Sequence, residues 1–102
     1  MDLMLSVQQA LVGEVTANMA AVTCALRPNL IVLRGYYFNA PTDDDKERLS
    51  SVGAEVIADF PPPYDIVEEC MHYQPSRHMP ECLDRWAFMR AEVEENVLAA
   101  NR

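Results

Sequence analysis

A segment rich in β-branched and aromatic residues, bounded by prolines, most constrains how this chain folds. Residues 29–39 (NLIVLRGYYFN) lie between Pro28 and Pro41, and their composition predicts a largely buried strand. The next residues have the pattern of a helix N-terminus. Thr42 can cap the first turn, Asp45 occupies the reciprocal capping-box position, and the intervening aspartates lie at the positive end of the helix dipole. Capping therefore accounts for this acidic run, which lacks the glycine and distal glutamate of a calcium loop.

The helix that begins after Thr42 has an apolar stripe at intervals of three and four residues, which is typical of a helix lying on a sheet. Gly53 within the stripe would permit a close approach to the sheet. Residues 61–63 are all proline and end the helix, after which residues 64–74 return as a second extended segment. The stripe consists of Leu49, Val52, Gly53, Val56, Ile57 and Phe60.

The N-terminal part of the chain allows two interpretations. Residues 3–14 predict a first helix. Its apolar stripe can continue through Met19 to Leu26, or residues 15–18 can form a loop before a strand over residues 19–26. In the second case residues 27–29 (RPN) turn this strand into the next one as a hairpin. The hairpin is favoured because Gly13 weakens a continued helix and because the following strand needs a neighbour.

The remaining segments complete one domain over residues 1–102. Residues 64–74 carry acids on both faces, which suggests a strand in an edge or a half-exposed position. Residues 83–90 alternate as a last strand, with Trp86 and Phe88 expected on one face, and residues 91–102 form a short terminal helix or a frayed tail. The predicted fold is α+β with the order αββαββ, one mainly antiparallel sheet and helices packed on one face.

Composition excludes several classes of protein. The formal net charge of -8 and the pI near 4.5 disfavour nucleic-acid binding. No apolar run approaches the length of a membrane span, and the N-terminus lacks the basic region of a secretory signal. Three cysteines without a framework spacing fit a reducing compartment. We therefore expect a cytoplasmic protein without a membrane partner.

One group of side chains could carry chemistry. Two sulfurs and two imidazoles could complete a tetrahedral zinc site, although their spacing matches no standard template. A cysteine nucleophile activated by a histidine could be formed from the same residues. The sequence, however, has no nucleophile-elbow motif, no glycine-rich oxyanion loop and no third residue in a known order to orient the histidine. We expect neither metal nor cofactor and no enzymatic activity. The group consists of Cys70, His72, His78 and Cys82.

Two surfaces are candidates for binding a partner. Tyr36 and Tyr37 are consecutive in a strand and must face opposite sides of the sheet. At least one of them therefore lies away from the helices. That tyrosine either contacts a partner or is covered by another segment of the chain. The second helix also has a polar stripe opposite its apolar one. A stripe of this kind is usually only a solvated face, but in a protein that binds a basic partner it would be the first surface to test. The acidic candidates are Glu47, Glu55 and Asp59, which share the stripe with Ser51, and Glu68 and Glu69 in the third strand.

The middle and end of the chain resemble a known type of protein. Residues 33–45 (LRGYYFNAPTDDD), 54–60 (AEVIADF) and 86–92 (WAFMRAE) are similar to small bacterial immunity proteins of the contact-dependent or polymorphic-toxin type. The resemblance covers residues 15–92 and departs from the pattern at residues 61–63 and in the loop with His78 and Cys82. It implies an αββαββ domain that binds a cognate toxin and blocks it.

The main hypothesis is therefore a non-enzymatic binding protein, an immunity protein that neutralises a bacterial toxin through an acidic surface. The partner would be a protein, with a basic toxin domain as the expected case, and the chain itself would be a monomer or a homodimer. The alternatives are a self-associating structural or regulatory module and a small zinc-binding protein.

Overall fold

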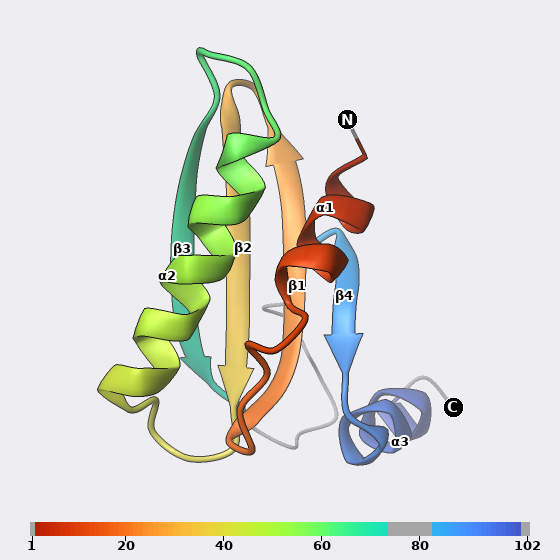
Figure 1. The fold of residues 1–102 in the computed structure, drawn as a ribbon. Helices are drawn as coiled ribbons and strands as arrows, with labels where there is room; N and C mark the ends of the chain where they lie inside the picture. The colour runs from red at the N-terminus through yellow and green to blue at the C-terminus, as the bar shows by residue number, and fades with distance from the viewer. Residues whose placement is uncertain (1, 74–82, 101–102) are drawn as a thin grey trace.

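The computed structural model of this chain describes residues 2–73 and 83–100. The described elements follow the order helix, two strands, helix, two strands, helix (Figure 1). The α+β class and the predicted order are confirmed, and the C-terminal segment adds a helix. The elements are α1 (Leu3–Ala10), β1 (Met19–Arg27), β2 (Leu30–Tyr37), α2 (Asp43–Ala58), β3 (Asp65–His72), β4 (Arg85–Met89) and α3 (Ala91–Ala100).

The hairpin interpretation of the N-terminal half is confirmed. β1 and β2 pair antiparallel, with Arg27 opposite Leu30, so only Pro28 and Asn29 form the turn. Asn29 has a φ of 57°, a left-handed conformation that asparagine tolerates better than most residues. α1 ends at Ala10, and the chain leaves it through Gly13 with a φ of 81°.

The four strands form one mixed sheet in the order β3-β2-β1-β4. β1 pairs antiparallel with both β2 and β4, while β2 and β3 are parallel. The parallel pair arises because α2 crosses over between β2 and β3 and returns the chain to the same end of the sheet. The mainly antiparallel sheet and the edge position of the third strand are thus both confirmed.

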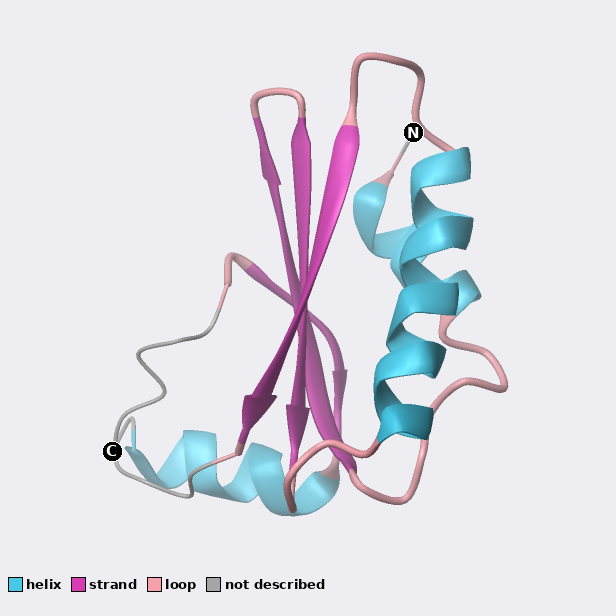
Figure 2. Cartoon of the chain, turned by 90° about the vertical axis from the view of Figure 1, so that its left-hand side faces the viewer, coloured by secondary structure: helices cyan, strands magenta, loops and turns pink. Residues whose placement is uncertain are grey.

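Two helices cover one face of the sheet. Figure 2 shows α1 and α2 together on one side and α3 at the end of the sheet, mostly on the other side. The core between α1, α2 and the sheet contains Val7, Leu33 and Val52, each fully buried. A second cluster on the opposite face joins Val93 of α3 to Tyr36. The predicted packing of helices on one face holds for α1 and α2.

The last strand departs from the predicted alternation. Trp86 packs with the second cluster, whereas Phe88 packs with the core beneath α1 and α2. The reason is a register shift: Trp86 pairs with Thr23 and Phe88 pairs with Val22. Ala87 is therefore an extra residue in β4, and a bulge of this kind breaks the period of two. The expectation that Trp86 and Phe88 share a face was wrong.

The close approach predicted at Gly53 is confirmed. A Cβ atom at this position would lie 2.8 Å from Cδ of Glu68. α2 can therefore lie directly against the half-buried side chain of Glu68 on β3. The absent side chain at Gly53 thus leaves room for Glu68 beneath α2.

Candidate partner-binding surface

The outer face of α2 carries the acidic stripe that the sequence predicts. Glu47, Ser51, Glu55 and Asp59 are all exposed, while Leu49, Val52 and Val56 on the opposite side are buried. From Lys46 onward the helix thus keeps its acidic residues on the exposed side, whereas Asp45 in the first turn is buried. The polar residues belong to a rigid element, so a partner would meet carboxylates whose backbone positions are already set.

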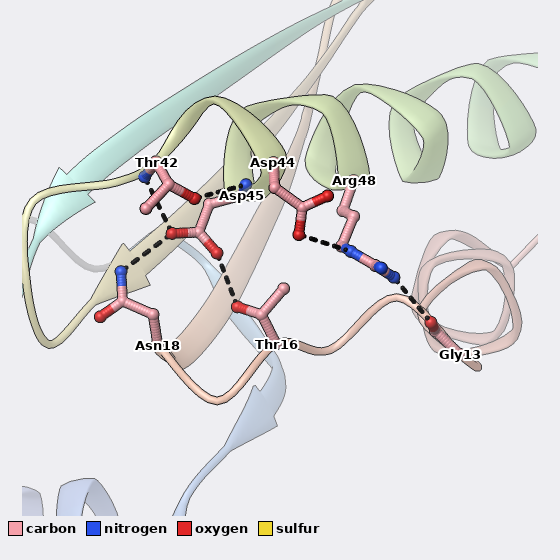
Figure 3. Close-up of polar contacts among 7 residues, drawn as sticks. All are labelled: Gly13, Thr16, Asn18, Thr42, Asp44, Asp45 and Arg48. Atoms are coloured by element: carbon pink, nitrogen blue, oxygen red, sulfur yellow. Dashed lines mark hydrogen bonds and ion pairs between the residues drawn. The ribbon is translucent and has the colours of Figure 1, made fainter.

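A capping box fixes the start of α2. The backbone N–H of Asp45 donates to Thr42 Oγ1 at 3.0 Å, and the backbone N–H of Thr42 donates to Asp45 Oδ2 at 2.9 Å (Figure 3). Both bonds satisfy amide groups that have no partner within the helix. The structural role predicted for this acidic turn is confirmed at Asp45.

The same carboxylate also holds the segment that leads into β1. Thr16 Oγ1 donates to Asp45 Oδ1 at 2.7 Å, and Asn18 Nδ2 donates to Asp45 Oδ2 at 2.9 Å (Figure 3). Burial by itself would raise the pKa of Asp45, but the hydrogen bonds from Thr42, Asn18 and Thr16 outweigh it and lower the pKa below its ordinary value of 3.8. Asp45 is therefore a charged structural residue, not a free acid.

A second tie joins α2 to the loop after α1. Arg48 donates to the Asp44 carboxylate at 3.0 Å and to the Gly13 carbonyl at 3.3 Å (Figure 3). The pair with Asp44 is one helical turn apart, an arrangement that stabilises helices modestly. Asp44 is thereby paired within the chain, while Asp43 and the later carboxylates of α2 are outside the ion pairs of the described residues.

α1 and α2 enclose a hollow of about 330 Å³ at the later end of the acidic stripe. Ser6 in α1 is buried, and its hydroxyl donates to Asp59 Oδ2 at 2.6 Å. Sequence reasoning missed the contribution of α1, because nothing local pairs Ser6 with a residue 53 positions later. The lining consists of Ser6, Gln9 and Ala10 from α1, and Glu55, Ala58 and Asp59 from α2 and its C-cap.

Glu68 and Glu69 of β3 lie on opposite faces of the sheet, as period two requires. Glu68 lies against α2, where it occupies the space opposite Gly53. Glu69 accepts hydrogen bonds from Arg34 Nε at 2.9 Å and Nη2 at 2.7 Å, and its side chain is 40% exposed. Both residues are therefore engaged within the fold, unlike Glu47 and Glu55.

Tyr36 and Tyr37 point to opposite faces as predicted, but both are buried, at 3% and 0% exposure. Tyr36 stacks on Trp86, with ring centroids 6.2 Å apart, and its hydroxyl is 3.3 Å from Thr23 Oγ1. The tyrosine that faces away from α1 and α2 is thus covered by other residues. The prediction that these tyrosines offer a contact surface is not supported, because aromatic packing on both faces of the sheet removes them from solvent.

Comparison with protein families supplies the functional class. The MafI2 immunity protein family matches residues 1–92. The chain belongs to this family. A comparison with curated proteins found no match. The resemblance to toxin-immunity proteins is therefore confirmed, and the family accounts for all but the last ten residues of the chain.

Membership in the MafI2 immunity protein family sets a coarse function, which is the neutralisation of a toxin by binding it. Immunity proteins are generally not enzymes, and a function of this kind needs a surface rather than a reactive centre. None of the described helices is long and apolar enough to cross a lipid bilayer.

The cysteine and histidine group is only partly within the described residues. Cys70 is half-buried on β3, where burial raises the pKa of its thiol, and the exposed His72 ring lies with Nε2 2.9 Å from the Phe38 carbonyl. His78 and Cys82 lie outside the described residues. Within residues 2–73 and 83–100, no three histidine, cysteine or acidic side chains are grouped as metal ligands.

Proposed function

We propose that this immunity protein neutralises its cognate toxin by covering a basic surface of it with the outer face of α2. The observation that carries the proposal is the free charge on this face. The ion pairs among the described residues join Arg27 to Asp84, Arg34 to Glu69 and Arg48 to Asp44. None of them involves Glu47, Glu55 or Asp59, so these three carboxylates remain available to cations of a partner.

Electrostatics supports this assignment. A chain with a formal net charge of -8 attracts a basic protein before contact, and complementary charges raise association rates more than they raise affinity. α2 with its C-cap contributes six carboxylates against two cations. The toxin would thus be drawn to this side of the molecule, in the cytoplasm where we place both proteins.

The way α2 is held also suits a binding surface. The capping box and the bonds from Thr16 and Asn18 fix its first turn. At the other end, the Ser6 hydroxyl holds Asp59 just beyond the last turn. Because the acidic face is already ordered, little conformational entropy is lost when a partner binds.

The test is a comparison of two triple variants against the toxin that the protein captures from its own cells. One variant carries Glu47→Gln, Glu55→Gln and Asp59→Asn; each change removes a charge, and an asparagine at 59 can still accept from Ser6. The control carries Glu92→Gln, Glu94→Gln and Glu95→Gln, which removes the same charge from exposed positions on α3. Association rates are measured at low and at high salt, together with inhibition of the toxin.

We expect the α2 variant to associate about tenfold or more slowly at low salt and to lose most of the salt dependence. The α3 variant should stay within about twofold of the wild type in the same assay. Equal slowing in both variants would mean that only net charge matters, and unchanged rates in the α2 variant would exclude this face.

A further inference from the structure

The hollow between α1 and α2 differs from the rest of the acidic face because it has depth. Its volume is about 330 Å³, and it lies where two small residues, Ala10 and Ala58, leave space between the helices. Pockets of a few hundred Å³ are large enough to enclose a whole ligand group. A side chain of a partner could therefore enter this hollow.

The polar atoms in the lining are mostly hydrogen-bond acceptors. The Ser6 hydroxyl donates its single proton to Asp59 Oδ2, so it offers only acceptor capacity to a ligand. Glu55 and Asp59 contribute carboxylate oxygens, and the Gln9 amide is the one group that can donate or accept. A lining of this kind binds a donor of positive charge and repels an anion.

We propose that this hollow receives an arginine side chain of the toxin. This inference rests on the proposed function and deepens it by naming the group that α2 recognises. A guanidinium presents five donors in one plane and is weakly hydrated, which suits a partly enclosed site with several acceptors. Its methylene groups would pack on Ala10 and Ala58 while its head meets Glu55 and Asp59.

A divalent cation fits the same hollow less well. Calcium and magnesium require about six oxygen ligands in a compact shell, and the two carboxylates of the lining fall short of that number. Within the described residues, no three acidic, histidine or cysteine side chains are grouped as metal ligands. The organic cation is therefore the occupant that the lining favours.

The test uses a small probe and does not depend on the toxin. N-acetyl-arginine amide is titrated into the full chain, and the methyl and side-chain amide resonances of Ala10, Ala58 and Gln9 are followed by NMR. N-acetyl-citrulline amide, which has nearly the same shape without the charge, is the control ligand. Magnesium and calcium chloride are titrated separately.

Two pairs of protein variants locate the probe. Ala58→Met fills the hollow without changing charge, and Ala54→Met adds the same side chain at an exposed position of α2 outside it. Glu55→Gln removes a carboxylate from the lining, and Glu94→Gln removes one from an exposed position on α3 outside it. All four substitutions are at exposed helix positions, so folding should be retained, which circular dichroism checks.

We expect saturable shifts at the three lining residues with the arginine probe and none with citrulline. Glu55→Gln should weaken probe binding about tenfold through the loss of a charge-assisted hydrogen bond, and Ala58→Met should weaken it at least as much by filling the space. Ala54→Met and Glu94→Gln should leave it unchanged. Shifts spread over all exposed carboxylates, no saturable shifts, or tighter binding of a metal ion would each overturn the inference. Because this probe assay omits the toxin, its failure would leave the proposed role of α2 standing. If the probe bound but the association test excluded α2, the hollow would bind a guanidinium without being the site that the toxin uses, and the inference would be overturned.

Discussion

Asp45 and Thr16 are joined by a 2.7 Å hydrogen bond from the threonine hydroxyl to the buried carboxylate. Residue 16 precedes β1 and residue 45 lies in the first turn of α2, so this contact ties the entry to the sheet to the helix that carries the acidic face. Asp45 is only 2% exposed, and its carboxylate accepts hydrogen bonds from Thr16, Asn18 and the Thr42 backbone.

Replacing Asp45 with asparagine should destabilise the protein strongly. An amide has only one acceptor oxygen, so it can accept from Asn18 and the Thr42 backbone only with its NH2 turned to the Thr16 hydroxyl, and all of these bonds lose the negative charge that strengthens them. We expect a loss of about 2–3 kcal/mol in the free energy of unfolding, measured by urea denaturation. The matched control is Asp43→Asn, an exposed first-turn position, which should cost less than about 1 kcal/mol. Equal effects would contradict the role assigned to Asp45.

Stability should fall in acid because of the same carboxylate. Its pKa in the folded state is lower than its ordinary value of 3.8. The contribution of Asp45 to stability is therefore complete above pH 3.8 and is lost as the pH falls through the lower, folded-state pKa. Urea midpoints measured from pH 7 to pH 2.5 should show the difference between wild type and Asp45→Asn shrinking only at the acidic end. A difference that stayed constant down to pH 2.5 would argue against a lowered pKa.

Two glycines should respond differently to alanine. A Cβ at Gly35 would lie 2.8 Å from the hydroxyl oxygen and 3.0 Å from Cε2 of Tyr37, a buried ring with no room to move. We expect Gly35→Ala to cost about 1–3 kcal/mol or more. At Gly53 the obstacle is the end of the Glu68 side chain, which can rotate, and alanine gains up to about 1 kcal/mol in helix propensity. Thermal unfolding of both variants tests this order, and a larger loss at Gly53 would refute it.

Removing the hydroxyl of Tyr37 should not weaken the fold. Among the described residues this buried oxygen makes no hydrogen bond of regular geometry, and the neighbouring Cys70 thiol is only a weak partner for it. Burial, followed by Cys70, raises the pKa of Tyr37 above 10.0. Tyr37→Phe should thus leave the free energy of unfolding unchanged or raise it by up to about 1 kcal/mol. Tyr36→Phe is the contrast, because it loses the contact with Thr23 Oγ1 and should cost about 1 kcal/mol. The opposite ranking in urea would show that Tyr37 has a polar partner in solution.

Much of the fold follows from signals that act over a few residues. The capping box at Thr42 and Asp45, the apolar stripe of α2 and the turn at Pro28 and Asn29 each depend on neighbours in sequence, and all three were predicted. The bulge at Ala87 was not, because its register depends on how β4 meets β1 across more than 60 residues. The acidic stripe was also predicted from the sequence, since a helix with one apolar face presents its remaining residues to solvent.

By itself, the sequence determined the class of fold, the start and end of α2 and the residues of its acidic face, because capping, periodicity and charge are local properties. Only the tertiary structure decided that Tyr36 and Tyr37 are both covered, that Glu69 is engaged by Arg34 and that Ser6 meets Asp59 beside a hollow. These outcomes depend on which segments pack together. Burial and pairing are properties of the packed chain, and residues far apart in sequence supply them.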